Sequence, residues 1–437
     1  MISVPKSPVG ALQRKELKLW PVVRVASGNF LEMYDFQVFG YYAAAIAVAF
    51  FPSGNEFVSL MFSLMTFGAG FLMRPLGAIV LGAYLDHHGR RPGLLLTLAL
   101  MAVGTLSIAG TPGYITLGLL APVLVVIGRL LQGLSAGVEV GGVSVYLSEI
   151  ATPGHKGFYC AWQNGSQQVA VIFAAVVGVA LSLSLSVDQM ERWGWRVPLW
   201  IGCAIIPLLF LLRRSLGETE EFLARDRRPT SSEILRSVAA NWRLVLLGMM
   251  LATTSSVFFY MMTVYTPTFG TAVLHLASTS SLIVTLCVGT SNFMWLLVMG
   301  ALSDRVGRRP LLVAVTVLTI MTAYPALLWL VSAPTFGRFL AVELWLSFML
   351  GGWHGPVGVF LTEIMPPEVR TSGVALAISL ATIFGGFTPA ACTYLIHTTG
   401  NRAIPGVWLS SAAALGLIAA VVLSPRRLMM REARAPA

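Results

Sequence analysis

Two carboxylates stand inside an apolar run of the sequence. Glu32 and Asp35 lie in the stretch NFLEMYDFQVF (residues 29–39), within a run from Val25 to Phe51 that is apolar enough to cross a bilayer. Insertion scales put the cost of an ionised acid at the centre of a membrane helix at about 2.5–3.5 kcal/mol. An acid that takes up a proton avoids this cost, so the pair indicates proton binding inside a membrane.

Other charged residues are predicted at the same depth. If the midpoint of each apolar run marks the bilayer centre, Glu32 and Asp35 fall within roughly 8 Å of it. Arg74 and Glu139 fall at nearly the same level, and Arg129 falls on the other side of the centre. Three acids against two arginines leave one negative charge over, and desolvation favours protonation of that carboxyl. We predict that Asp35, nearest the midplane, carries the proton, with Glu32 and Glu139 as alternatives; a static ion network is the competing interpretation.

Arg129 is the residue best suited by type to bind an anionic substrate. A guanidinium donates two parallel hydrogen bonds to a carboxylate and keeps its charge. Uncharged donors recur in other apolar runs, where hydrogen bonding between helices is the competing interpretation. The predicted substrate-binding residues are Asn29, Arg129, Gln132, Gln163, Gln167, Tyr260, Asn292 and His354.

Membrane helices must position these side chains. The chain has 437 residues, of which 56% are hydrophobic and 11% charged, whereas soluble proteins carry roughly 25% charged residues. Apolar runs long enough to span a bilayer recur along its whole length. We predict an all-α integral membrane protein with twelve spans, near residues 25–50, 57–83, 93–110, 119–147, 157–185, 197–213, 243–269, 279–302, 310–331, 338–363, 371–396 and 404–424.

The net charge of +10 follows membrane topology. With both termini in the cytoplasm, 23 of the 29 Lys and Arg residues fall on inner segments and four on outer segments. This positive-inside asymmetry predicts a multi-pass protein of the inner (cytoplasmic) membrane with cytoplasmic termini. The basic excess therefore does not indicate a nucleic-acid partner.

The sequence carries no signal for enzymatic chemistry. All four cysteines lie inside predicted spans, and the His and Cys residues do not cluster at metal-ligand spacing. The sequence has no phosphate-binding glycine loop and no nucleophile elbow in the required context. We therefore expect no metal, no cofactor and no catalytic residue.

Two internal repeats divide the chain. GAYLDHHGRR at residues 82–91 recurs as GALSDRVGRR at 300–309, and LSEIATP at 147–153 recurs as LTEIMPP at 361–367. Recurrence at such regular offsets indicates two copies of one structural unit. We predict a six-helix N-terminal half (1–213), a cytoplasmic linker (214–242) and a six-helix C-terminal half (243–437), with substrate bound between the halves.

The repeated loop resembles the signature of the major facilitator superfamily, G-x-x-x-D-[RK]-x-G-R-[RK], with His87 at the usual basic position. Within that superfamily, GNFLEMYDFQVFGYYA, FLMRPLGA, GRLLQGLSAGVEVGG and WGWRVP are similar to stretches of the metabolite–proton symporters. VSVYLSEIATPG and VYTPT resemble the citrate and tricarballylate symporters in particular. The resemblance covers essentially the whole chain, and it implies the major facilitator fold and symport of a carboxylate with protons.

The signature loops predict a gate at the cytoplasmic side. Their glycines suit close helix packing and a tight turn, and their aspartates suit the N-terminus of a neighbouring helix. Their arginines can reach a glutamate of the second repeat, and breaking such pairs would shift the balance of outward-open and inward-open states. The competing interpretation is that the arginines only enforce topology. The predicted gating residues are Gly82, Asp86, Gly89, Arg90, Arg91, Glu149, Asp304, Arg308, Arg309 and Glu363.

These features together predict a secondary active transporter with alternating access. It imports a di- or tricarboxylate, citrate or tricarballylate, by symport with protons and not with sodium. The alternatives are a proton-coupled symporter of another small metabolite (a 2-oxo acid, shikimate or a zwitterionic osmolyte) and a non-transporting membrane sensor. The expected partners are the carboxylate, protons and the lipid bilayer, and we expect a monomer.

Overall fold

The computed structural model describes residues 28–88, 90–137, 147, 151, 154–214, 236, 239–366 and 370–423, and the regular structure in these ranges is helical. The helices before residue 215 are α2 (Gly28–Tyr41), α3 (Ala43–Phe50), α4 (Glu56–Leu72), α5 (Arg74–His88), α6 (Arg90–Gly110), α7 (Tyr114–Leu117), α8 (Leu120–Ala136), α10 (Lys156–Ser184), α11 (Val187–Gln189), the π-helical turn η1 (Met190–Gly194) and α12 (Arg196–Arg214). After residue 241 they are α15 (Trp242–Tyr260), the π-helical turns η2 (Met261–Tyr265) and η3 (Phe269–Val273) with α16 (Thr266–Thr268) between them, α17 (Ser278–Val306), α18 (Arg308–Ser332), α19 (Phe336–Ile364), α20 (Arg370–Thr399) and α21 (Ile404–Val422).

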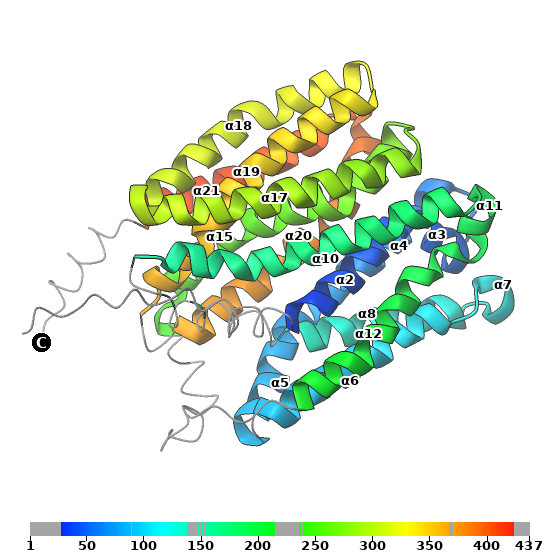
Figure 1. Ribbon diagram of the computed structural model, residues 1–437, viewed down its shortest axis with the longest axis horizontal. Helices are drawn as coiled ribbons and strands as arrows, with labels where there is room; N and C mark the ends of the chain where they lie inside the picture. Colours follow the sequence, from blue (N-terminus) through cyan, green and yellow to red (C-terminus); the bar gives the residue numbers. More distant parts are fainter. Residues whose placement is uncertain are drawn as a thin grey trace, which may run out of the picture.

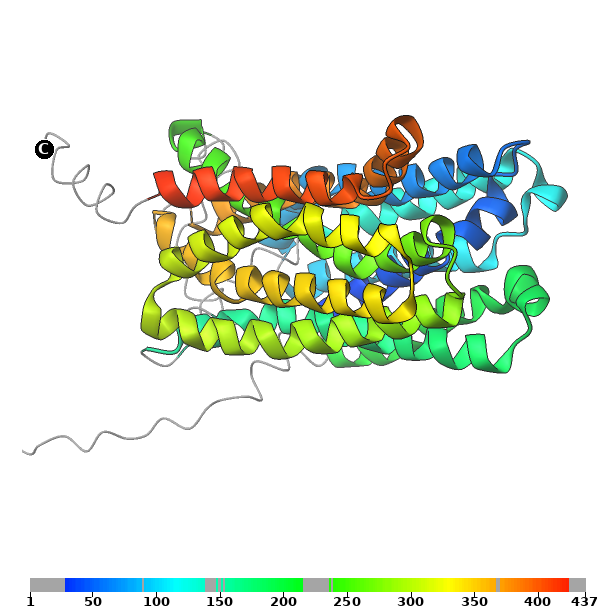
Figure 2. The same ribbon diagram turned by 90° about the horizontal axis from the view of Figure 1, so that it is seen from above.

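The predicted membrane spans coincide with these helices. Among the described residues, eight helical segments are long and apolar enough to cross a bilayer, and three shorter apolar helices are Leu95–Gly110, Leu120–Ala136 and Arg196–Leu208. Each of them falls in a different predicted span, and α2 with α3 accounts for the first span. The long helices run along the long axis of the molecule in both views (Figures 1 and 2). The all-α membrane fold is confirmed, and the chain is a multi-pass membrane protein.

The second span is interrupted next to a basic residue. Pro75 follows Arg74 and has no N–H, so it cannot donate the helical hydrogen bond to the carbonyl of Phe71, four residues earlier. Accordingly α4 ends at Leu72, the N–H of Met73 bonds to the Gly70 carbonyl at 3.2 Å, and α5 begins at Arg74. Arg74 therefore lies at a break within the span, where its side chain reaches α2.

Two helix pairs join the first and second parts of the chain. α10 packs along α17, and α4 packs along α20; α10 and α17 lie side by side in Figure 1. The backbones of the first pair are close where two glycines meet, because a Cβ on Gly300 would lie 2.9 Å from the carbonyl oxygen of Gly157. Small residues at this crossing let the two backbones come together.

The buried apolar residues form two main clusters. One consists of residues between Leu251 and Leu423, and the other consists mainly of residues between Met33 and Leu199, with Phe259, Tyr260, Val264 and Leu282 added. This grouping follows the predicted division into halves. Most of the predicted linker lies outside the described residues, so the boundaries 213/214 and 242/243 stay predictions.

The π-helical turn η2 of the second half contacts α2 of the first half and so joins the two halves on one side of the molecule. Gln37 of α2 donates from Nε2 to Oγ1 of Thr263 at 3.2 Å. One turn further along α2, Gly40 packs against the side chain of Val264, where a Cβ would leave no room. We call these four residues the η2 closure. Gln37 and Gly40 follow Met33 along α2, and Thr263 and Val264 follow Tyr260. The η2 closure is therefore on the side of the molecule opposite the loop between α17 and α18.

Candidate functional site

A cavity lies between the halves. Residues of α2, α5, α10, α15, α19 and α20 line it: Met33, Arg74, Gln163, Asn164, Gln167, Ala252, Ser255, Ser256, Phe259, Tyr260, His354, Val357, Gly358, Leu361, Ile378 and Thr382. Its wall combines apolar side chains with a few amides, hydroxyls, one imidazole and one guanidinium. A mostly apolar pocket with a small number of convergent polar groups is typical of a small-molecule site.

Arg74 is the cation of this cavity. Its Nη2 donates to Oε1 of Glu32 at 2.7 Å, and both side chains are 2% exposed. The guanidinium carbon also lies 4.6 Å from the ring centre of Phe71 and 5.1 Å from that of Phe36. Nε of Arg74 has no hydrogen-bond partner among the described residues. A buried ion pair at the edge of a cavity can exchange one anion for another, because an incoming carboxylate offers the guanidinium the same hydrogen bonds.

Asp35 belongs to a second polar network, inside the first half. Its Oδ2 accepts a short hydrogen bond from Thr105 of α6 and lies 3.4 Å from Nε2 of Gln132. Gln132 in turn accepts from Nη1 of Arg129 at 2.7 Å. Room for the carboxylate comes from Gly202 of α12, where a Cβ would lie 2.6 Å from Oδ1 of Asp35. Gln132 thus connects Asp35 with Arg129.

Arg129 lies within an aromatic cage. Its guanidinium carbon is 4.3 to 5.1 Å from the ring centres of Phe36, Phe39 and Phe67. The side chain is fully buried and is not among the described residues that line the cavity. Cation–π contacts stabilise a desolvated guanidinium, so the protein itself surrounds this cation.

The uncharged donors of the cavity come from both halves. Gln163, Asn164 and Gln167 project from α10, and Asn164 donates from Nδ2 to the carbonyl of His354 at 3.2 Å. Nε2 of His354 lies 3.4 Å from the carbonyl of Ser255. Because a carbonyl only accepts, this nitrogen carries the hydrogen, and a neutral His354 presents an acceptor at Nδ1. The imidazole must therefore be protonated before it can donate from Nδ1 to a carboxylate.

The structure separates the predicted substrate residues into two groups. Gln163, Gln167, Tyr260 and His354 line the cavity, whereas Asn29, Arg129, Gln132 and Asn292 are buried and are not among the described residues that line it. Asn292 donates to the Ser347 carbonyl at 3.2 Å and so joins α17 to α19. Glu139 lies outside the described residues. The sequence predicted Arg129 as the substrate-binding arginine, but Arg74 is the one in the cavity wall. The proline after Arg74 indicates a helix break, and such a break lets a side chain enter the cavity.

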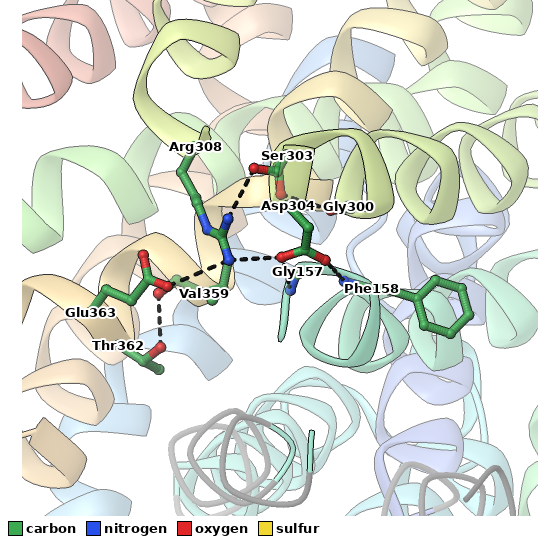
Figure 3. A network of polar contacts seen from close by, with 9 residues as sticks. All are labelled: Gly157, Phe158, Gly300, Ser303, Asp304, Arg308, Val359, Thr362 and Glu363. Atoms are coloured by element: carbon green, nitrogen blue, oxygen red, sulfur yellow. Dashed lines mark hydrogen bonds and ion pairs between the residues drawn. The ribbon is translucent and has the colours of Figure 1, made fainter. Parts of the chain in front are cut away.

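A network of polar contacts surrounds the second signature loop (Figure 3). Asp304 accepts hydrogen bonds from the backbone N–H groups of Gly157 at 2.9 Å and Phe158 at 3.2 Å, in the first turn of α10. Arg308 donates to Asp304 at 2.7 Å and pairs with Glu363 at 3.5 Å. Asp304 therefore lies at the N-terminus of a helix of the other half, where the helix dipole favours an anion.

Three expectations for the signature loops need correction or stay open. Arg309 does not pair with Glu363 but donates to the carbonyls of Ala420 and Val421 at 2.8 and 2.9 Å, because adjacent helical residues point in different directions. Among described atoms, none lies within 4 Å of a Cβ on Gly82, so the predicted close packing is found at Gly300 instead. Gly89, Glu149 and the side chains of Asp86, Arg90 and Arg91 lie outside the described residues.

We expect Asp304→Asn to slow transport cycling while leaving substrate affinity nearly unchanged. The substitution keeps the shape but removes the charge that Arg308 and the first turn of α10 stabilise, and it lies away from the cavity. Calorimetric binding of the carboxylate that the resemblance implies, measured beside its uptake rate, separates the two effects. Asp188→Asn is the matched control, because Asp188 forms an i,i+4 pair with Arg192 that is largely exposed. Loss of binding with intact cycling would contradict this role.

The fold and the cavity define a secondary transporter of two joined halves, and comparison with known proteins identifies its family. Residues 25–389 match the Major Facilitator Superfamily, and the chain belongs to this family. It is 56% identical over 406 residues to a citrate-proton symporter of Salmonella typhi, with 93% of this chain and 94% of the relative covered. It is 55% identical over 410 residues to a citrate-proton symporter of Klebsiella pneumoniae, with 94% and 92% covered.

A solved structure has the same fold. The crystal structure of a D-xylose-proton symporter superimposes with a TM-score of 0.72, covering 93% of this chain and 97% of the other at 18% sequence identity. At this identity the likeness shows the fold alone. Together with the family match it confirms the predicted major facilitator fold.

Proposed function

We propose that this protein imports citrate, or a closely related di- or tricarboxylate such as tricarballylate, together with protons. Support comes from its identity to two citrate-proton symporters over nearly the whole chain. The observation that carries the proposal is a cavity between the halves in which a guanidinium, Arg74, is paired with a buried acid, Glu32. We further propose that the protein acts as a monomer in the inner membrane with both termini in the cytoplasm, and that it is not an enzyme.

Competition for Arg74 couples the two fluxes in this proposal. When Glu32 is ionised, it holds the guanidinium and opposes a second carboxylate beside it. When Glu32 takes up a proton, Arg74 becomes available to a substrate carboxylate. Gln163, Gln167 and Tyr260 supply further donors for the remaining carboxylates and hydroxyl. The proton and the substrate are therefore bound together, and alternation of the halves carries both across the membrane.

We propose Glu32 as the proton carrier in preference to Asp35; Glu139 lies outside the described residues and stays an alternative. Glu32 bonds directly to a residue of the cavity wall, whereas Asp35 bonds to Thr105 and Gln132 behind that wall. We assign Asp35 to holding α2 against α6 and α8. The sequence alone favoured Asp35, because depth in the membrane does not show which side of the helix faces the cavity.

We expect citrate accumulation to require the proton gradient and not sodium. Radiolabelled citrate uptake into proteoliposomes, under an imposed pH gradient with the lumen alkaline, measures this directly. A protonophore should abolish accumulation, exchange of sodium for potassium should not change it, and excess tricarballylate should compete. Accumulation that continues after the protonophore would contradict proton coupling.

The same vesicles separate the alternative functions. A symporter of a zwitterionic osmolyte would transport glycine betaine and leave citrate outside, and shikimate or 2-oxoglutarate can be tested in the same way. A sensor would bind a ligand without moving it. The buried guanidinium in the cavity favours an anion over a zwitterion, because a substrate with a fixed positive charge would lie against Arg74.

A further inference from the structure

A buried acid in the second half takes no part in the transport cycle described so far. Glu343 of α19 is 4% exposed, and Oγ1 of Thr266 lies 3.1 Å from its Oε2. Among the residues that the structure describes, no Lys, Arg or His forms an ion pair with Glu343. An ionised carboxylate without a cation is very costly in such surroundings, whereas a protonated carboxyl needs only an acceptor for its hydrogen.

The hydrogen bonds of Thr266 depend on whether Glu343 carries a proton. The Thr266 hydroxyl has a single hydrogen, yet it lies 2.8 Å from the carbonyl of Met262 as well as 3.1 Å from Glu343. If Glu343 is protonated, its O–H donates to Thr266, and the hydroxyl hydrogen goes to Met262. If Glu343 is ionised, it takes the hydroxyl hydrogen for itself, and the Met262 carbonyl loses this partner. One proton therefore decides whether η2 keeps the bond.

The first half contains a similar arrangement. Thr105 donates to the carboxylate of Asp35 and also lies 3.0 Å from the carbonyl of Met101, four residues earlier in its own helix. There, Gln132 donates from Nε2 to Thr105 at 3.0 Å and connects the group to Arg129. Glu343 has no such neighbour among the described residues. Asp35 is thus connected to a cation through Gln132, whereas the hydrogen bonds of Glu343 depend only on whether Glu343 itself carries a proton.

η2 is also the segment that joins the halves. The η2 closure consists of Gln37 and Gly40 of α2 against Thr263 and Val264, the two residues directly after Met262. π-helical turns interrupt the regular helical hydrogen bonds and often mark functional positions. A change at the Met262 carbonyl is therefore transmitted to the contacts that hold this side shut.

The titratable groups around Glu343 are few. η2 contributes Tyr265, which accepts a hydrogen bond from Thr393 of α20 at 3.2 Å. On α19 itself, Arg338 is exposed and donates to the Trp329 carbonyl and to Ser332, while His354 is eleven residues further along, about 16 Å at the rise of an α-helix. Within the described residues, the remaining titratable side chains in the middle of the surrounding helices are Tyr260 of α15, Cys287 of α17, Tyr324 of α18 and Cys392 of α20.

We propose that Glu343 is a second protonatable residue of the transporter, separate from the Glu32–Arg74 pair, and that its proton stabilises the η2 closure through Thr266. In this role Glu343 is a positioning residue and does not touch substrate. The state in which the η2 closure is formed binds one more proton than the state in which it is open. Raising the pH therefore shifts the protein toward the state with an open η2 closure. This holds with or without substrate and does not depend on which metabolite is carried.

Hydrogen–deuterium exchange of the substrate-free protein in nanodiscs tests the proposal. Exchange of peptides covering Met261–Val273 is corrected for the intrinsic rate at each pH. In the wild type we expect it to rise with pH by up to about tenfold per pH unit, the limit for one linked proton. Glu343→Gln donates to Thr266 at every pH, so its exchange should stay low and independent of pH.

Two further variants make the result decisive. Thr266→Val keeps the acid and removes the hydroxyl, so its exchange should also be independent of pH; it decides the matter if Glu343→Gln does not fold. Glu56→Gln is the matched control, an exposed acid at the first turn of α4 whose loss should leave the wild-type dependence intact. A wild-type pH dependence in Glu343→Gln or in Thr266→Val, or none in the wild type, would overturn the proposal.

Discussion

Arg74→Lys is expected to weaken citrate binding by about 30-fold, a loss on the order of 2 kcal/mol, near the contribution of a hydrogen bond to a charged group. Lysine keeps the charge but loses the planar pair of donors that matches a carboxylate. Its ammonium is also more strongly hydrated, so drawing it into the cavity costs more. Calorimetric titration of the purified protein with citrate at a pH that favours protonated Glu32 measures the loss.

Two arginine-to-lysine controls show whether the loss of binding is specific to Arg74. Arg192→Lys changes an exposed residue and should bind citrate as the wild type does. Arg129→Lys removes the guanidinium from the cage of Phe36, Phe39 and Phe67, so we expect a lower melting temperature with nearly normal affinity in the folded protein. Normal binding by Arg74→Lys, together with lost binding by a stable Arg129→Lys, would make Arg129 the substrate cation.

Glu32→Gln is expected to separate citrate binding from proton transport. Glutamine resembles the protonated acid, so Arg74 stays available at every pH and citrate should bind tightly throughout. In the wild type, affinity should fall as the pH rises through the ionisation of Glu32, by up to about tenfold per pH unit for one linked proton. The ionisation of citrate itself affects both proteins equally. Exchange of internal for external citrate should persist in the variant, while accumulation driven by a pH gradient collapses.

Asp35→Asn provides the contrast within the same helix. It removes a charge from the Thr105–Gln132 network but leaves the Glu32–Arg74 pair intact, so we expect accumulation to continue at a reduced rate. The outcome that contradicts the assignment is the reverse pattern: accumulation retained in Glu32→Gln and lost in Asp35→Asn with exchange preserved. Asp35 would then be the carrier, as depth in the membrane alone predicts.

Most of the fold could be predicted from the sequence because a bilayer imposes a simple rule. Every backbone polar group must be satisfied within the membrane, so long apolar runs become helices. Such runs predict all twelve spans, and the repeated signature loop predicts that the chain consists of two similar six-helix halves. Boundaries inside spans were not predictable in this way: hydropathy does not distinguish the break at Met73, and it does not reveal the π-helical turns η2 and η3.

The candidate site was predicted less completely, for a physical reason. Depth along a helix follows from counting residues, but the direction of a side chain depends on how the helix is rotated against its neighbours. Arg74 and Arg129 are both intramembrane arginines, yet one lies in the cavity wall and the other inside an aromatic cage. The direction of Asp304 toward a helix N-terminus was predictable from the loop motif, whereas the contacts of Arg309 with α21 depend on tertiary packing.

Proton movement driven by a citrate gradient tests the coupling through Glu32 and Arg74 most directly. Proteoliposomes with a pH-sensitive dye in the lumen receive external citrate with no pH gradient and with the membrane voltage clamped. We predict that the lumen acidifies as citrate enters in the wild type, and that Glu32→Gln, in vesicles loaded with unlabelled citrate, exchanges it for labelled external citrate without this acidification. Citrate entry without acidification in the wild type, or equal acidification in both proteins, would contradict the account.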